Sequence, residues 1–331
     1  MLDPAVAATR LAVRTALSDV PEGSVVLVAL SGGADSLALA AAVAHEARAR
    51  GIRVASVTVD HGLQEGSDRI ARAAGDKAAA LGIDPLIVAV EIGSDVRAAG
   101  GLEAAAREAR YSVLRDAAAD AGAAAVFLGH TLDDQAETVL LGLARGAGGT
   151  SLAGMAPVRE DERGVRWVRP LLGLRRETTV GACAAQGLEP WEDPHNSDAR
   201  FSRVRVRERV LPVLERELGP GIAEALARTA EQLREDSEAF ADMIDETIED
   251  IVEHAEAGIA VSVAALAANP PALRHRIIRH VVQAEFGAAL TRVQTLEVAR
   301  LATHWSGQGP IDLPSCTASR ENALIIFTSR T

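Results

Sequence analysis

The sequence SGGADS at residues 31–36 combines small residues, hydroxyl groups and a carboxylate in a pattern that suits phosphate binding. Paired glycines let the backbone approach a ligand closely, and a helix that begins here directs free N–H groups at an anion. A carboxylate belongs beside phosphate where Mg²⁺ bridges the two groups. The alternative is a tight turn whose Ser and Asp side chains cap a helix. We expect six residues to bind a nucleotide: Ser31, Gly32, Gly33, Ala34, Asp35 and Ser36.

A second group of reactive side chains lies in GHTLDDQAET, residues 129–138, where a predicted strand is followed by a predicted helix. Asp133 and Glu137 are four residues apart and share a helix face, and Asp134 lies beside them. His130 precedes them at the exit of the strand. Acids are common in any first helical turn, but several acids with a histidine favour an active-site role. The expected tasks are Mg²⁺ coordination, with Asp133 as one candidate ligand, and the binding of a cationic amine.

Two weaker patterns accompany these clusters. Asp60 and His61 follow a predicted strand, where the adenine and ribose of a nucleotide often lie in such folds. Hydrogen bonds within a turn are the alternative. Arg107 and Arg110 are i, i+3 neighbours that offer two permanent cations to a triphosphate or to RNA phosphate. A solvated helix face is the alternative for this pair.

Residues 200–209 carry five arginines inside an acidic protein. The alternation RVRVR is compatible with a strand, whereas its continuation as ERVLPVL favours a helix with Arg203 and Arg207 on one face. Arginine forks onto phosphates and neutralises them, so we expect contact with a phosphate backbone. A solvated stripe is the alternative.

Alternating strand and helix patterns position these side chains. Apolar runs predict strands, and Ala- and Leu-rich stretches between them predict helices. Together they predict an α/β fold with a doubly wound parallel sheet, in which ligands bind beyond the carboxyl ends of the strands. The polar clusters fall at those ends. The predicted strands are 25–30, 54–59, 85–90 and 124–129, and the predicted helices are 36–49, a stretch ending at Leu81, 102–121 and 133–144.

Length and charge indicate two domains. At about 150 residues per domain, the 331 residues divide into a first domain, 1–215, and a second domain, 216–331. The second is mainly helical, with short β-like runs over 309–328. The formal net charge is −12, but acids concentrate in 231–256, so arginine-rich regions elsewhere can still attract a polyanion.

Composition excludes several classes of protein. A hydrophobic fraction of 48% and a charged fraction of 24% exclude wholesale disorder. With Cys183 and Cys316 as its two cysteines, the chain alone cannot build a CxxC zinc site or an iron–sulfur cluster. Lys77 is the single lysine, so a GxxxxGK[ST] phosphate loop is absent. No window approaches about 18 uninterrupted apolar residues, so we expect no membrane partner and a cytoplasmic location.

The first loop matches SGGxDS, the pyrophosphate-loop (PP-loop) signature of the N-type ATP pyrophosphatases, which activate a carbonyl oxygen with AMP and release pyrophosphate. Taken in order, the motifs of residues 23–215 resemble the tRNA(Ile)-lysidine synthetase family. Val204 departs from that family, in which Asn follows the first Arg of the last motif. The chain resembles the short form, without the additional C-terminal domain of longer members. The motifs are SGGADS, VDHGL, LEAAAREARY, GHTLDDQAETVLLGLARGAG, RPLL and WEDPHNSDARFSRVRVR.

The resemblance implies a Rossmann-like sheet, a second domain that binds tRNA, and a reaction that uses ATP with Mg²⁺. ATP adenylates the C2 carbonyl oxygen of the wobble cytidine in the CAU anticodon of tRNA(Ile). The ε-amine of free L-lysine then attacks C2, and AMP leaves to give lysidine. Whether the chain forms a homodimer stays open.

The resemblance also implies roles for individual residues. Asp35 would hold Mg²⁺ at the phosphates. Asp134 and Glu137 would bind the ammonium groups of lysine and accept a proton as the amine attacks. Three arginines would contact ATP phosphates or the flipped-out cytidine: Arg110, Arg203 and Arg207. The expected catalytic set is Asp35, Arg110, Asp134, Glu137 and Arg203, and the nucleotide-binding set adds Asp60, His61, Arg107 and His130 to the loop.

Three alternatives stay open. A PP-loop tRNA thiolase usually needs a catalytic cysteine pair or cluster ligands near the loop. An amidotransferase relative needs a glutaminase domain, for which the chain has no spare length. A non-catalytic nucleotide-binding protein would account for SGGADS but not for the acid cluster or the arginine run.

Overall fold

A computed structural model describes residues 2–62, 64, 66–91, 101–146, 148–193, 198–255 and 258–330. Of the motifs quoted above, Leu63, Ala147 and residues 194–197 lie outside the described residues. The chain divides into two compact units, Met1–Arg234 and Glu235–Thr331. The domain boundary near residue 215 stays a prediction.

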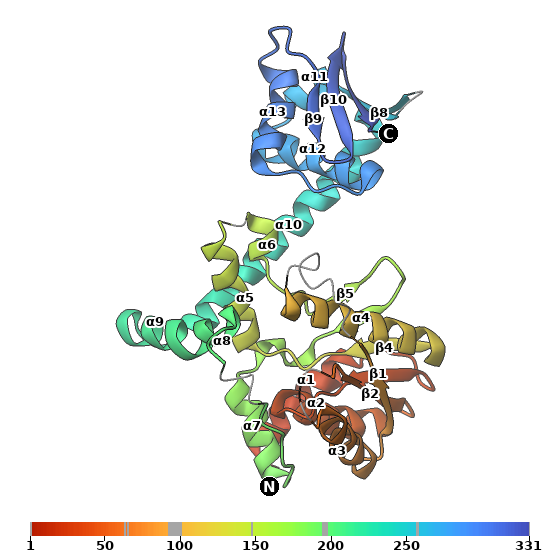
Figure 1. The fold of residues 1–331 in the computed structure, drawn as a ribbon, viewed down its shortest axis with the longest axis vertical. Helices are drawn as coiled ribbons and strands as arrows, with labels where there is room; N and C mark the ends of the chain where they lie inside the picture. Colours follow the sequence, from red (N-terminus) through yellow and green to blue (C-terminus); the bar gives the residue numbers. More distant parts are fainter. Residues whose placement is uncertain are drawn as a thin grey trace. The chain divides into compact units, whose positions relative to one another are not determined.

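The first unit is built on a six-stranded sheet of order β3-β2-β1-β4-β6-β5 (Figure 1). Neighbouring strands are parallel except β5 and β6, which pair antiparallel. The predicted α/β fold is therefore confirmed. The strands are β1 Val25–Ala29, β2 Arg53–Asp60, β3 Asp84–Ala89, β4 Ala123–Phe127, β5 Val158–Glu160 and β6 Arg166–Val168.

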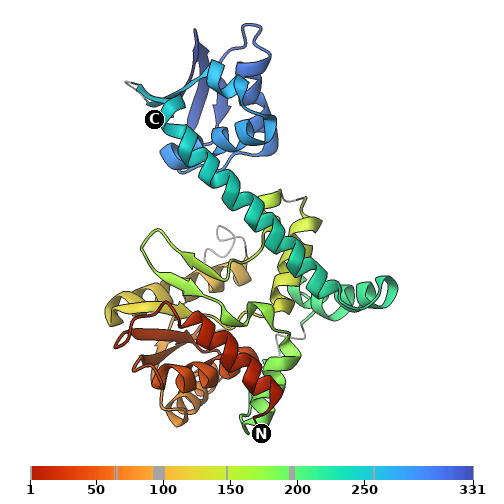
Figure 2. The same cartoon turned by 180° about the vertical axis from the view of Figure 1, so that it is seen from behind.

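Helices cover both faces of this sheet. Val26 and Val28 of β1 pack on one face, in the core shared with α1, α2 and α7. Leu27 points to the opposite face, where Leu114 of α4 covers the sheet. Helices α1 and α7 lie side by side in both views (Figures 1 and 2). The helical segments are α1 Pro4–Ala16, α2 Ala34–Arg48, α3 Ser67–Ala80, α4 Leu102–Ala121, α5 Leu132–Ala144, α6 Gly149–Leu152, η1 Pro170–Gly173, α7 Arg176–Ala185, α8 Ser202–Arg205, η3 Val206–Val210 and α9 Leu211–Leu218.

The carboxyl ends of β1, β2 and β4 bring the polar sequences together. SGGADS follows β1, Asp60 ends β2, and Gly129 and His130 follow β4. A Cβ atom on Gly129 would lie 3.0 Å from backbone atoms of Asp35 and Ser36. A glycine is needed here because any side chain would push the start of α2 away from the end of β4.

Helix α7 is docked onto this edge by Asp133 of α5. Asp133 Oδ2 accepts the backbone N–H of Arg176 at 2.7 Å, and its Oδ1 lies 3.2 Å from the guanidinium of Arg175. The first amides of a helix have no partner inside it, and Arg175, the N-cap residue, makes no side-chain capping bond. An acid from another helix therefore supplies the missing cap.

The basic run is helical, as the continuation ERVLPVL indicates, and the strand alternative is wrong. Segments α8, η3 and α9 follow one another without a break. The five residues of η3 form a π-helix. Val204 and Val206 are buried, while Arg203 and Arg207 both face Glu137 of α5.

The second unit combines helices with a five-stranded antiparallel sheet of order β7-β8-β11-β10-β9. The helices and the β structure expected near its end are found, but β7 and β8 had not been predicted. Strand β8 begins at Gly258, where a Cβ atom would lie 2.0 Å from the carbonyl oxygen of Phe327, so the close pairing with β11 requires glycine. The remaining elements are α10 Ile222–Ile251, which begins in the first unit, β7 Val252–Ala255, β8 Gly258–Ser262, α11 Val263–Ala268, α12 Pro271–Phe286, α13 Arg292–Thr303, β9 Ile311–Leu313, β10 Cys316–Glu321 and β11 Leu324–Ser329.

Among the described residues, no helix has the length and apolar character that crossing a membrane requires.

Gly129→Ala is expected to lower the free energy of unfolding by about 1–3 kcal/mol, the usual cost of overpacking. The added methyl group would press on the backbone at the start of α2. Gly173→Ala is the control, because its Cβ would meet nothing within 4 Å. Urea unfolding of both variants measures the difference, and equal stabilities would contradict the close approach.

Asp133→Ala is expected to lower the free energy of unfolding by about 1 kcal/mol, because the first turn of α7 would lose its cap. Thermal unfolding with and without Mg²⁺ measures this effect. Asp116→Ala removes an exposed acid whose nearest cation is 3.9 Å away, and it should change little. If Asp133→Ala keeps the wild-type stability without Mg²⁺ but loses the stabilisation that Mg²⁺ gives the wild type, Asp133 is a metal ligand instead.

Candidate active site

Ser36 holds the SGGADS loop in shape. Its buried hydroxyl donates to the carbonyl oxygen of Gly33 at 3.0 Å and accepts the N–H of Ser31 at 3.2 Å. Gly32 has a φ of +84°, and its carbonyl oxygen accepts the N–H of Trp191 at 2.9 Å. Ser31 is exposed beside the start of α2. The loop therefore presents a hydroxyl and a helix N-terminus, a combination that suits an anion.

A cavity of about 230 Å³ opens next to the loop, between the ends of β1 and β2. Its walls include Val57, Ile70 and Trp191, and its polar lining includes Asp60 and His61. Apolar walls combined with polar groups that can fix orientation are typical of a pocket for a flat ring such as a nucleotide base. The expected nucleotide residues Asp60 and His61 thus face one cavity, and their binding role stays a prediction.

The two arginines of α4 that were expected to bind phosphate, Arg107 and Arg110, have different surroundings. Arg110 lines the same cavity. Burial, with a contribution from Arg110, lowers the pKa of His61, so this ring is neutral at pH 7. Arg107 is exposed and lies over the ring of Tyr111, 4.9 Å from its centroid. Arg107 is outside the lining of the cavity as far as the described residues define it.

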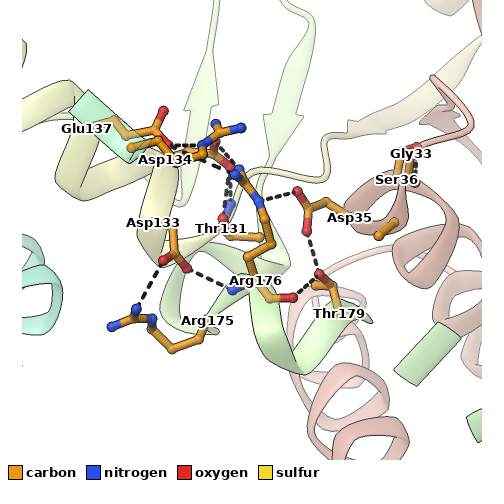
Figure 3. Close-up of polar contacts among 12 residues, drawn as sticks. Gly33, Asp35, Ser36, Thr131, Asp133, Asp134, Glu137, Arg175, Arg176 and Thr179 are labelled. Atoms are coloured by element: carbon orange, nitrogen blue, oxygen red, sulfur yellow. Dashed lines mark hydrogen bonds and ion pairs between the residues drawn. The ribbon is translucent and has the colours of Figure 1, made fainter. Parts of the chain in front are cut away.

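Three carboxylates and three guanidiniums meet at the ends of β1 and β4. Figure 3 shows the Arg176 guanidinium between the loop and α5. Its Nε lies 3.1 Å from Asp35 Oδ2, and its Nη2 lies 2.7 Å from Asp134 Oδ1. Its Nη1 is 4.0 Å from Glu137 Oε1. We call the following residues the ion cluster: Asp35, Asp134, Glu137, Arg176, Arg203 and Arg207.

Glu137 is the most deeply buried member of the ion cluster, with 0% of its side chain exposed. Its Oε1 accepts a hydrogen bond from Arg207 Nε at 2.6 Å. Its Oε2 lies 3.9 Å from Arg203 Nη1 and has no hydrogen-bond partner within the described residues. Burial raises the pKa of Glu137 despite the bond from Arg207. One oxygen of a buried carboxylate is therefore left to receive a donor.

Asp134 and Asp35 are both mostly buried, but their pKa values are shifted in opposite directions. Burial opposes ionisation of Asp134, but Arg176 and the Thr131 amide hold the pKa of this carboxyl below its ordinary value. Asp134 Oδ2 accepts both the N–H and the hydroxyl of Thr131, at 2.8 and 2.9 Å, in a capping box. Burial raises the pKa of Asp35 against the opposing effects of Arg176 and Thr179.

His130 lies just after β4, near the carboxylate of Asp134 and several arginines. Burial lowers the pKa of His130 to about 3, and nearby arginines oppose its protonation further. The ring is therefore neutral, and its Nδ1 is buried without a hydrogen-bond partner in the described part of the chain. A neutral imidazole can donate or accept one hydrogen bond from a ligand but cannot supply a positive charge.

The donor set fits Mg²⁺ in combination with phosphate. Asp35 and Asp134 direct carboxylate oxygens, the ligands that this ion prefers, toward one cation, Arg176. Mg²⁺ is commonly held by one or two carboxylates together with phosphates of the substrate. Within the described residues, no three His, Cys, Asp or Glu side chains are arranged so that together they could hold a metal ion. Asp133 is engaged by the start of α7, away from the position between Asp35 and Asp134.

Arg176 and Thr179 of α7 are site residues that the motifs did not reveal. The hydroxyl of Thr179 donates to Asp35 Oδ1 or to the carbonyl oxygen of Arg176. One signal was present in the sequence. A cation in the first turn of a helix opposes the helix dipole, so two neighbouring arginines at the start of a helix, here Arg175 and Arg176 of α7, indicate acidic partners elsewhere in the chain.

No lysine side chain of the protein belongs to the ion cluster. All cations of the ion cluster are guanidiniums, and Lys77 donates from Nζ to the carbonyl oxygen of Glu189. Cys183 and Cys316 are both free and buried.

Two family models match the chain. A PP-loop domain covers residues 8–214, and a TilS substrate binding domain covers residues 262–323. The tRNA(Ile)-lysidine synthase of Leifsonia xyli subsp. xyli is 56% identical over 310 residues, covering 93% of this chain and 91% of that protein. The tRNA(Ile)-lysidine synthase of Thermobifida fusca is 49% identical over 322 residues, covering 96% of each chain.

A solved structure supports the fold. The U34-tRNA thiolase NcsA from Methanococcus maripaludis superposes with a TM-score of 0.57 at 20% identity, covering 70% of this chain and 79% of that one. At this identity the likeness concerns the fold alone. The motifs, the family models and the relatives agree, and the chain belongs to the tRNA(Ile)-lysidine synthase family.

Proposed function

We propose that this protein ligates free L-lysine to C2 of the wobble cytidine in a CAU-anticodon tRNA(Ile), with ATP as the energy source. The observation that carries the proposal is the position of Glu137. A wholly buried carboxylate with an unused oxygen lies in the same ion cluster as Asp35 of the phosphate loop. An acid site for an amine therefore adjoins the site for a nucleotide.

ATP would bind along the carboxyl ends of β1 and β2. Its phosphates suit the start of α2 and the exposed hydroxyl of Ser31. Its base suits the cavity lined by Trp191 and His61. Arg110, on the wall of that cavity, would provide a permanent positive charge near the α-phosphate.

Asp35, with phosphate oxygens, would hold Mg²⁺, which neutralises charge on the departing pyrophosphate. The fit rests on the carboxylate of Asp35, which already lies 3.1 Å from a cation, Arg176.

The first chemical step joins the C2 oxygen of cytidine to the α-phosphorus of ATP and breaks the bond to pyrophosphate. Negative charge builds on the leaving group and on the phosphorus oxygens. The start of α2 stabilises this charge without reorganising, because hydrogen bonds within the loop already hold it in place, and nearby guanidiniums add positive charge. Arg203 and Arg207 are candidates for contact with the cytidine or its phosphates.

In the second step, the ε-amine of lysine bonds to C2 and AMP leaves with the oxygen. The amine must lose its proton before or during the attack. Burial raises the pKa of Glu137, and a carboxylate with a raised pKa is a better proton acceptor than an ordinary one. Glu137 Oε2 would receive the ammonium group and then its proton, while Asp134 would bind the other ammonium group of lysine.

The second unit offers a surface for RNA phosphates. Burial and neighbouring arginines lower the pKa of His275 and of Arg279, which indicates a concentration of positive charge. Within the described part of this unit, neither Arg279 nor Arg292 forms an ion pair. We propose that these residues contact the tRNA backbone, and we call them the basic cluster: Arg274, His275, Arg276, Arg279 and Arg292.

The decisive experiment supplies the protein with ATP, Mg²⁺, labelled lysine and unmodified tRNA(Ile) bearing a CAU anticodon. Label is expected in the RNA. Asp35→Asn is expected to lower its incorporation by about 100-fold or more while the protein stays folded, because charge stabilisation of several kcal/mol is lost. A non-catalytic nucleotide-binding protein would give no label. Label in a CAU-anticodon methionine tRNA would contradict the proposed selectivity.

The KM for lysine is expected to rise at acidic pH. Glu137 holds an ammonium only when it is ionised. Because its pKa is raised, it takes up a proton at a higher pH than an ordinary glutamate, whose pKa is about 4.3. KM should be constant above that raised pKa and increase as pH falls through it. Initial rates against lysine concentration, at saturating ATP and tRNA, measure this dependence.

Glu137→Gln is the matching variant for the pH series. It should raise the KM for lysine by about tenfold or more at neutral pH, because a charge-assisted bond is lost, and it should flatten the acidic rise. Glu108→Gln, at an exposed acid of α4, should retain the wild-type profile. An unchanged acidic rise in Glu137→Gln would assign the titration to another group.

The double substitution Arg279→Gln/Arg292→Gln is expected to weaken tRNA binding and to reduce the slope of log K against log salt by about 1 per arginine. Arg330→Gln is the control, because that arginine lies 3.5 Å from Asp312 in an exposed pair of the same unit. Filter binding at several salt concentrations gives the slopes. Identical slopes for the wild type and the double variant would remove the basic cluster from the RNA interface.

A further inference from the structure

Arg176 touches the proposed nucleotide site and the proposed lysine site at once. Its Nε lies 3.1 Å from Asp35 of the phosphate loop, and its Nη2 lies 2.7 Å from Asp134 of α5. One guanidinium thus bridges an acid that faces phosphates and an acid that faces an amine (Figure 3). Any movement of this group changes the charge at both sites.

The backbone of Arg176 is fixed independently of its side chain. Asp133 holds its N–H at 2.7 Å, and the Thr179 hydroxyl lies 2.7 Å from its carbonyl oxygen. The side chain is 25% exposed, so the guanidinium can exchange partners without crossing a closed core. Helix α7 therefore holds the backbone of Arg176 in place, while its guanidinium lies at a partly exposed position.

Charge balance determines the direction of exchange. The ion cluster contains three carboxylates and three guanidiniums, so it is formally neutral. A lysine ammonium that enters it adds an unmatched positive charge, which is costly in a buried site. A triphosphate beside Asp35 adds negative charge, which attracts Arg176 away from Asp134. The two ligands therefore compensate each other if Arg176 moves toward the phosphates.

We propose that Arg176 is a positioning residue that couples the two sites: it holds Asp35 and Asp134 together without ligands, and nucleotide binding draws it to the phosphates and frees Asp134 for lysine. This inference rests on the proposed function for the identity of the ligands. It makes nucleotide binding increase the affinity for lysine, and by linkage lysine increases the affinity for nucleotide by the same factor. The amine is then admitted when the activating group is already present.

The test measures the Kd of labelled lysine by equilibrium dialysis, with and without α,β-methylene-ATP and Mg²⁺. This analogue is suitable because a CH₂ group replaces the oxygen between its α- and β-phosphorus atoms, so adenylation cannot break that link. Wild-type protein is expected to bind lysine at least about fivefold more tightly with the analogue, the lower end of common coupling factors. The Kd of the analogue, measured with and without lysine, should change by the same factor.

Arg176→Gln should reduce the coupling factor to about one, because a neutral amide has no charge to transfer between the sites. Arg176→Lys keeps the charge but not the fork that reaches two carboxylates, so it should give an intermediate factor. Arg175→Gln is the matched control. Arg175 lies at the same helix start but pairs with Asp133 and Glu224, and its loss should leave the coupling factor at the wild-type value.

A purely structural Arg176 would lower thermal stability without changing the ratio of the two lysine Kd values. Full coupling in Arg176→Gln, or in Arg176→Lys if the Gln variant does not fold, overturns the proposal. A wild-type factor of one also overturns it. If wild-type protein still transfers lysine to tRNA in that case, the proposed function stands, whereas absence of both lysine binding and transfer removes both.

Discussion

A carboxylate removed from water must be paired, and this constraint organises the carboxyl edge of the first unit. Glu137 is fully buried, and Asp134 and Asp35 are largely so, yet each has a guanidinium within reach. Unpaired, such groups would cost several kcal/mol each. Segments that are remote in the chain are therefore joined by charge: the phosphate loop, α5, α7 and the helix that carries Arg203 and Arg207.

The choice of arginine for this edge follows from geometry. A guanidinium has several donors in a planar fork and can serve two acids at once, whereas an ammonium acts as a point charge. Arg176 uses this property to span the loop and α5, and Arg207 uses it to reach both Glu137 and Asp134, at 2.6 and 3.6 Å. The pairing leaves Glu137 Oε2 without a hydrogen bond from the described residues, so the cluster is not saturated.

Sequence patterns predicted the scaffold and the main clusters for identifiable physical reasons. Buried parallel strands are continuous apolar runs, so β1 and β4 stood out, and the residues that follow them had to share one edge. Arg176 and Thr179 could not be placed, because their partner Asp35 lies 141 and 144 residues away in the chain. Strands β7 and β8 are four and five residues long and follow a long helix, so local preference did not separate them from it. Spacing alone could not show that Asp133 caps α7 or that Arg107 lies over Tyr111, and the binding roles expected for both residues stay predictions.

The near-absence of lysine from the protein has a chemical consequence for the proposed reaction. A cytidine activated at C2 is an electrophile. A primary amine of the protein held near it would attack C2 in place of free lysine and would link the RNA covalently to the protein. Guanidiniums stay protonated throughout the physiological range, so the arginines around the site are inert toward such a group. The single lysine ammonium of the chain, on Lys77, is engaged by a main-chain carbonyl. An enzyme built this way presents abundant positive charge to RNA yet leaves the nucleophile to be supplied from solution, which guards it against self-modification.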